Sequence, residues 1–148
     1  MTIIVLADDD PDDRIFFEEA LNEVDVATQL TAVGDGAELM KTLAKTVDVP
    51  PPPPHVIFLD LNMPFKNGFE CLKEIRETPR LKNIPVVIFS TSSNQDSIEA
   101  TYSLGANCYI SKPGSHQLLK KAIETVLSLS LWDKNHQLPK KNFVLAIS

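Results

Sequence analysis

Short apolar runs alternate with helical stripes of apolar residues along the whole chain. Five runs are too short for helices and mostly rich in β-branched residues, which predicts strands over 3–7, 29–33, 56–59, 85–89 and 107–110. Apolar residues at helical spacing predict helices over 11–24, 38–47, 68–77, 96–104 and 115–131. Because a helix follows every strand and no hairpin signal joins two strands, we expect an α/β fold with a five-stranded, parallel, doubly wound sheet.

The run over 56–59 is the best defined of the five strands. Its four consecutive apolar residues are typical of a strand buried on both faces. Asp60 follows it directly, and Pro64 and the Asn67-Gly68 pair then indicate a loop. Open α/β sheets place their ligand sites at the carboxyl ends of the strands, so Asp60 is a candidate functional acid. Taken alone, Asp60 is explained equally well as a cap of the following loop or helix.

Polar side chains follow the neighbouring predicted strands as well. Asp8 and Asp9 come after the first strand, Ser90 after the fourth, and Lys112 after the fifth. Since the carboxyl ends of parallel strands share one edge of the sheet, we expect these groups to meet Asp60 there. Three carboxylates in one crevice repel one another unless a cation lies among them, and Mg²⁺ prefers such oxygen ligands. A lysine and a hydroxyl beside them suit phosphoryl transfer, with Asp60 as the nucleophile and Asp8 and Asp9 as metal ligands.

Composition narrows the class of protein. The 148 residues carry a net charge of −6 and no basic cluster larger than a Lys-Lys pair, which argues against direct nucleic-acid binding. No apolar run approaches the length of a membrane span. The two cysteines, Cys71 and Cys108, are expected to be reduced thiols of a cytoplasmic protein. We expect one domain over 1–131 and a tail over 132–148, in which Trp132 and Phe143 pack on the domain in preference to a partner.

Four segments together are similar to one known family. They are Ile-Val-Leu-Ala-Asp-Asp-Asp at 4–10, Phe-Leu-Asp-Leu-Asn-Met-Pro-Phe-Lys-Asn-Gly at 58–68, Ser90, and the pair Lys112-Pro113. From residue 2 to about 131 the chain resembles the receiver domain of two-component response regulators. More loosely, the proline run Pro50–Pro54 and the last predicted strand resemble stand-alone receivers of the cyanobacterial phytochrome-associated type. The resemblance implies a flavodoxin-like (βα)5 fold with strand order 2-1-3-4-5.

The resemblance also implies a role for each matching residue. Asp60 is the implied phosphoacceptor, Lys112 the ligand of the phosphoryl oxygens, and Ser90 and Tyr109 the implied switch residues. Mg²⁺ is the implied cofactor, held by Asp8, Asp9, Asp60 and the backbone carbonyl of Asn62. The implied partners are a histidine kinase, a downstream protein, and a second copy bound through the face of helix 96–104, strand 107–110 and helix 115–131. Such a protein is a signalling module with no output domain, and is not itself an enzyme.

Two other functions share parts of this pattern. A phosphatase of the haloacid-dehalogenase type uses an Asp-x-Asp nucleophile motif on the first strand, followed by Thr. Asp8-Asp9-Asp10 contains Asp-x-Asp, but no Thr follows and Asp60 is left unexplained. A flavodoxin-like cofactor binder needs a Ser/Thr/Gly-rich phosphate loop after the first strand, where this chain has acids that repel a phosphate.

Overall fold

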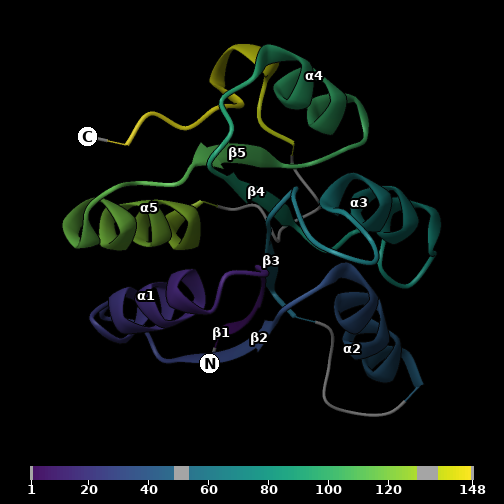
Figure 1. The fold of residues 1–148 in the computed structure, drawn as a ribbon, viewed down its shortest axis with the longest axis horizontal. Coiled ribbons are helices and arrows are strands. Elements are labelled where there is room, and N and C mark those ends of the chain that lie inside the picture. The colour runs from purple at the N-terminus through teal and green to yellow at the C-terminus, as the bar shows by residue number, and fades with distance from the viewer. Residues whose placement is uncertain (1, 49–53, 130–136, 148) are drawn as a thin grey trace.

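The computed structural model describes residues 2–48, 54–129 and 137–147 (Figure 1). The strands are β1 (Thr2–Ala7), β2 (Thr28–Val33), β3 (Val56–Leu59), β4 (Val86–Ser90) and β5 (Cys108–Ser111). The helices are α1 (Pro11–Asn22), α2 (Gly36–Asp48), α3 (Gly68–Glu77), α4 (Gln95–Ser103) and α5 (His116–Ser128), with a short 3₁₀ helix at Lys140–Asn142. The strands form one parallel sheet in the order β2-β1-β3-β4-β5, which confirms the predicted fold class and strand order.

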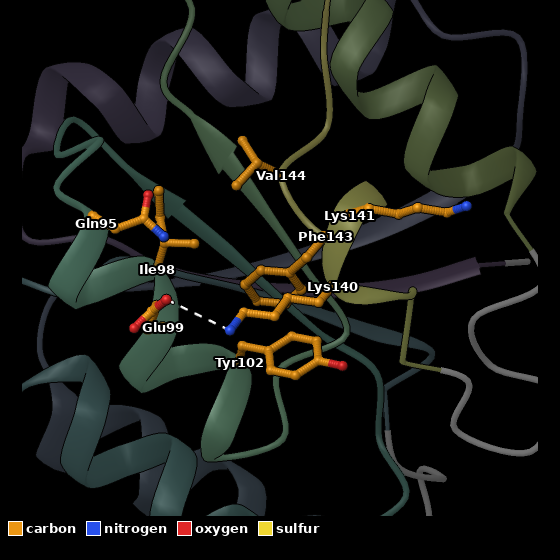
Figure 2. Close-up of a pocket in the computed structure, with 8 residues that line it drawn as sticks. All are labelled: Gln95, Ile98, Glu99, Tyr102, Lys140, Lys141, Phe143 and Val144. Carbon is orange, nitrogen blue, oxygen red and sulfur yellow. Dashed lines mark ion pairs between the residues drawn. The ribbon is translucent and has the colours of Figure 1, made fainter.

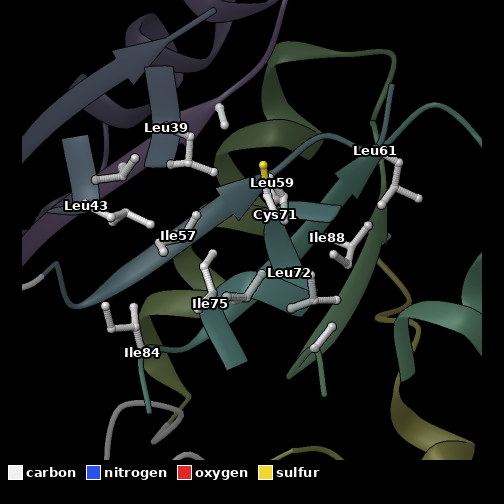
Figure 3. Close-up of a cluster of buried hydrophobic side chains, with 14 of the residues drawn as sticks. Leu39, Leu43, Ile57, Leu59, Leu61, Cys71, Leu72, Ile75, Ile84 and Ile88 are labelled. Atoms are coloured by element: carbon white, nitrogen blue, oxygen red, sulfur yellow. The ribbon is translucent and has the colours of Figure 1, made fainter. Parts of the chain in front are cut away.

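Helices cover both faces of the sheet (Figure 1). One face packs on α1 and α5, where the rings of Phe17, Phe58 and Phe89 meet edge to face with centroids 5.0–6.1 Å apart. The other packs mainly on α2 and α3, as Figure 3 shows for Ile57 and Leu59 of β3 beside Leu72 and Ile75 of α3. Every residue of β3 is buried, which confirms the prediction of a strand covered on both faces, and every residue of β4 is buried as well.

Element boundaries differ from the predicted ones by up to three residues. Helix α2 begins at Gly36, two residues earlier than predicted, because the Asp35 carboxylate accepts a hydrogen bond from the Glu38 backbone at 2.7 Å. Gly36 lies against the loop after β3, and a Cβ atom there would lie 1.9 Å from the Lys66 carbonyl oxygen. Helix α5 ends at Ser128, where Leu129 turns to an extended conformation.

The described part of the tail, residues 137–147, lies along β5; we call it the C-terminal segment. The Tyr109 backbone N–H donates to the Phe143 carbonyl, and the Leu145 N–H donates to the Tyr109 carbonyl, each at 2.9 Å. Val144 thereby forms a parallel bridge with Tyr109 at the edge of the sheet. Phe143 is 1% exposed, which confirms its predicted packing on the domain. Trp132 and residues 49–53 of the proline-rich stretch lie outside the described residues.

Two further features bear on function. No helix in the described parts of the chain is long and apolar enough to cross a membrane. Cys71 and Cys108 are both buried and free, and burial raises the pKa of Cys71 to about 11 and that of Cys108 to about 12. Both thiols are therefore protonated at neutral pH and are poor nucleophiles.

Candidate functional site

Three carboxylates meet at the carboxyl edge of the sheet. Asp8 follows β1 and Asp60 follows β3, and the pairing of Ala7 with Leu59 brings the two strand ends level. Asp8 is completely buried, Asp60 is 6% exposed, and Asp9 is exposed. One oxygen from each of the three lies within 4.8 Å of the others. This donor set consists of hard oxygen ligands with one side open to solvent, so the residues fit a divalent cation that retains some of its water.

Lys112 contacts groups at the ends of three strands, two of them through ion pairs. Its Nζ atom lies 2.7 Å from Asp8 Oδ2 and 3.2 Å from Asp60 Oδ2, and its backbone N–H donates to the Ser90 carbonyl at 2.8 Å. Burial disfavours the ammonium, but its hydrogen bonds to Asp8 and to Asp13, together with the nearby carboxylate charges, outweigh this and raise the pKa of Lys112. The site therefore holds a permanent positive charge beside Asp60 at neutral pH.

Asp8 is an electrostatically costly member of the group. Burial raises the pKa of Asp8, although hydrogen bonds from Lys112 and from the Asp10 backbone oppose that rise. The Asp10 N–H donates to Asp8 Oδ1 at 3.0 Å, and the Arg14 guanidinium donates to the Asp8 carbonyl at 2.6 Å. A divalent cation between Asp8, Asp9 and Asp60 would relieve the repulsion that remains among these carboxylates.

The loop after Asp60 is closed by backbone contacts. The Asn62 N–H donates to Asp60 Oδ1 at 3.3 Å, and the Gly68 N–H donates to the Leu61 carbonyl at 3.0 Å. A Cβ atom on Gly68 would lie 2.3 Å from the Asp60 carbonyl oxygen, so only glycine permits this close return of the chain. Within the loop, Phe65 has a φ of 66° and is 88% exposed, a conformation unusual for a bulky residue.

Ser90 and Tyr109 lie on the two last strands of the sheet. Ser90 is fully buried at the end of β4, and its hydroxyl oxygen accepts a hydrogen bond from the Ser92 backbone at 3.2 Å. Tyr109 on β5 is also fully buried, and its hydroxyl donates to the Ser92 carbonyl at 2.7 Å. Both side chains therefore bond to the same residue of the loop after β4.

Some features of the site were not predicted from the sequence. Asp13, in the first turn of α1, places Oδ2 3.0 Å from Lys112 Nζ, and Arg14 holds the backbone of Asp8. The sequence shows Asp13 only as one of several acids at a helix start, where acids are ordinary. Its distance from Lys112 depends on how α1 packs on the sheet beside α5, which no local pattern records. The exposed, left-handed Phe65 likewise has no local signal.

Comparison with known proteins then decides the family. The family model for the response regulator receiver domain matches residues 4–124. The chain belongs to this family.

Individual receiver-domain proteins are similar over most of their length. Response regulator Rcp1 of Synechocystis sp. is 36% identical over 130 residues, which is 87% of this chain and 88% of that protein. The solved structure of Mn²⁺-bound Rcp1 has a TM-score of 0.76 and 34% identity, covering 94% of this chain and 99% of that one. The solved structure of the phosphorylated cyanobacterial phytochrome response regulator RcpA has a TM-score of 0.78 and 36% identity, and it covers 93% of this chain and 98% of that one. These relatives confirm the resemblance to stand-alone receivers of the cyanobacterial phytochrome-associated type.

Proposed function

We propose that this receiver domain accepts a phosphoryl group from a histidine kinase on Asp60 with Mg²⁺ bound. Asp8, Asp9, Asp60 and the backbone carbonyl of Asn62 are the proposed ligands of the cation. The observation that carries the proposal is the convergence of three carboxylates and a buried lysine at one edge of the sheet. The phosphorylated state of RcpA and the Mn²⁺ of Rcp1 give independent support from relatives. The protein then acts as a signalling module in the cytoplasm and is not itself an enzyme.

In the proposed transfer, an oxygen of Asp60 bonds to phosphorus while the phosphorus–nitrogen bond of the kinase phosphohistidine breaks. The histidine leaves with the bonding electron pair and takes up a proton, and an acyl phosphate remains on Asp60. Lys112 is close enough to Asp60 to neutralise the phosphoryl oxygens that arrive there. When bound, the cation supplies further charge neutralisation and orients those oxygens.

The position of Asp10 argues against the phosphatase alternative. Asp10, the second acid of the Asp-x-Asp sequence, is exposed, and its carboxylate caps α1 by accepting from the Asp12 backbone at 2.9 Å. This carboxylate is occupied in starting the helix and is not among the three acids that converge. Asp60, by contrast, is one of those three acids.

Ser90 and Tyr109 are proposed to carry the signal from Asp60 to β5. The Ser90 hydroxyl would move to the new phosphoryl oxygens and give up its bond from the Ser92 backbone. Because Tyr109 is bonded to the Ser92 carbonyl, a shift of that loop alters the support of the Tyr109 ring.

The proposed output face, formed by α4, β5 and α5, includes the C-terminal segment. Phe143 packs with its ring centroid 6.3 Å from that of Tyr109 and 5.1 Å from that of Tyr102. A groove of about 500 Å³ runs between α4 and this segment, with Ile98, Tyr102, Phe143 and Val144 among its lining residues and Lys140 paired with Glu99 at 3.5 Å (Figure 2). A downstream partner or a second copy that binds this face would therefore also contact the C-terminal segment.

Replacing Ser90 with Ala is expected to separate phosphorylation from switching. Asp60 should still be labelled, because the proposed acceptor, the other acids and the lysine beside it are all unchanged in this variant. The change in the Tyr109 ring resonances on phosphorylation, measured by NMR, should be lost. Thr91→Ala, an exposed neighbour, is the control and should keep that change. If the Tyr109 ring resonances of Ser90→Ala change on phosphorylation as they do in the wild type, Ser90 does not carry the signal to Tyr109.

The proposed function itself is tested by intact-mass spectrometry of the wild-type protein with acetyl phosphate. We expect a gain of one phosphoryl group that requires Mg²⁺ and is prevented by EDTA, with peptide mapping placing it on the segment that contains Asp60. A protein that gains no mass at any Mg²⁺ concentration would retain the receiver fold without the proposed chemistry.

A further inference from the structure

The ammonium of Lys112 is held by carboxylates from three separate elements. Asp8 Oδ2 at the end of β1 lies 2.7 Å from Nζ, Asp13 Oδ2 on α1 lies 3.0 Å away, and Asp60 Oδ2 after β3 lies 3.2 Å away. A lysine ammonium has three hydrogens to donate, so each can be given to one of these carboxylates. Of the three acids, Asp13 is the one without an assigned role in the proposed phosphoryl transfer.

Asp13 contacts Lys112 but is not one of the acids of the proposed cation site. The three acids whose oxygens converge within 4.8 Å are Asp8, Asp9 and Asp60, and Asp13 is not among them. Its place is nevertheless well defined, because Pro11 and the cap of Asp10 begin α1 immediately before it and Arg14 ties the same turn to the Asp8 carbonyl. The Asp13 side chain is 38% exposed, whereas that of Lys112 is 10% exposed.

We propose that Asp13 is a positioning residue that holds the Lys112 ammonium toward α1 and so lowers the affinity of the Asp60 pocket for phosphoryl oxygens. The proposal rests on the proposed function and names a residue that regulates it. The Asp13 and Asp60 carboxylates contact the same nitrogen, so their oxygens are at most about 6 Å apart. A phosphoryl group on Asp60 that Lys112 also contacts brings further negative charge to the ammonium that Asp13 holds, and at separations of a few ångströms two negative charges repel measurably even near a surface.

Competition for hydrogen bonds acts in the same direction. Once phosphorylated, Asp60 presents phosphoryl oxygens that need a donor, and Lys112 is the cation that already contacts that side chain. As long as Asp13 accepts one of the three ammonium hydrogens of Lys112, only the other two can be donated to the phosphoryl group. With Asp13 neutral, the hydrogen that Asp13 held is bound less strongly and can turn toward Asp60, while Asp8 still holds another. Asp13 thus sets how strongly the pocket holds an anion.

The test uses beryllofluoride, a non-covalent mimic of the phosphoryl group, titrated calorimetrically into the full chain with Mg²⁺ present. We expect Asp13→Asn to bind it roughly three- to tenfold more tightly than wild type, from the lost repulsion and the freed lysine. Asp13→Glu, which keeps the charge, should stay near the wild-type affinity. Asp12→Asn is the matched control, because Asp12 is exposed in the same first turn of α1 and has no contact with Lys112.

A readout specific to Lys112 separates positioning from a general effect on stability. The ¹⁵N resonance of the Lys112 ammonium should shift in Asp13→Asn and stay unchanged in Asp12→Asn. Equal or weaker beryllofluoride binding in Asp13→Asn would overturn the proposal, and so would an equal gain in Asp12→Asn. If the wild-type protein binds no beryllofluoride and takes no phosphoryl group from acetyl phosphate, the proposed function fails, and the role of Asp13 fails with it.

Discussion

Asp60→Asn is expected to abolish the Mg²⁺-dependent gain of a phosphoryl group completely. An amide oxygen is a far weaker nucleophile than a carboxylate, and the product of its attack would not be an acyl phosphate. Asp60 is 6% exposed, and its Oδ2 lies 3.2 Å from the Lys112 ammonium. Intact-mass spectrometry after incubation with acetyl phosphate measures the effect, with wild-type protein labelled in parallel.

Asp9→Asn is the matched control, since Asp9 belongs to the same acidic group but is exposed. We expect this variant to need several-fold more Mg²⁺ and still to reach the wild-type extent of labelling when Mg²⁺ saturates. The pair of variants therefore separates the acceptor from a cation ligand. If Asp60→Asn gains a phosphoryl group at the wild-type rate, a residue other than Asp60 is the acceptor. Loss of labelling in Asp9→Asn at every Mg²⁺ concentration would give Asp9 a larger role than that of one ligand.

The members of this site that were predictable share one property. Asp8, Asp60, Ser90 and Lys112 each lie at or directly after the end of a buried parallel strand, and the ends of such strands share one edge of the sheet. Once alternating strands and helices indicate that sheet, the convergence of these residues follows from topology. The uninterrupted apolar run of β3 predicted its burial for the same reason, because a strand between two layers of helices has no solvent face.

The contacts that escaped prediction depend on how helices and the tail pack. Asp13 contacts Lys112, which is 99 positions away in the sequence. Phe143 was predicted to pack on the domain, but not to meet Tyr109 there. Neither contact follows from periodicity, which reports the face that an element buries but not the element that it meets there. The register of residues 137–147 on β5 is likewise set by backbone hydrogen bonds, for which every residue except proline carries the same groups.

Arg76→Met is expected to lower the free energy of unfolding by about 3–5 kcal/mol. The Arg76 guanidinium on α3 donates hydrogen bonds to four oxygens. These oxygens are the backbone carbonyls of Lys82, Ile84 and Gly105 and the side-chain Oδ1 of Asn107, at 2.8–3.0 Å. Methionine keeps the apolar stem and removes all five N–H donors, so part-buried acceptors before β4 and β5 lose their bonds.

The site of Arg76 explains why the effect should be large. Asn107 Oδ1 accepts from both Arg76 and the Val86 backbone, each at 2.8 Å, so one group aligns the starts of β4 and β5. Burial lowers the pKa of Arg76 to about 10, which still leaves the guanidinium charged at neutral pH. A planar fork of donors satisfies acceptors in several directions, which a lysine ammonium in the same place cannot do. Arg76→Lys should therefore recover only part of the loss.

Urea denaturation followed by circular dichroism measures these differences. Lys73→Met, an exposed change of a charged residue to Met on the same helix, is the control and is expected within about 0.5 kcal/mol of wild type. Similar midpoints for Arg76→Met and Lys73→Met would mean that water replaces the guanidinium at all four oxygens, and Arg76 would not be the link between the two strand starts. A loss confined to Arg76→Met, with partial recovery in Arg76→Lys, would instead identify the forked geometry of its donors as the cause. β4 and β5 end at Ser90 and Ser111, beside Lys112. The hydrogen bonds of Arg76 and Asn107 at the starts of these two strands would then help to align their ends, which lie at the same edge of the sheet as Asp60.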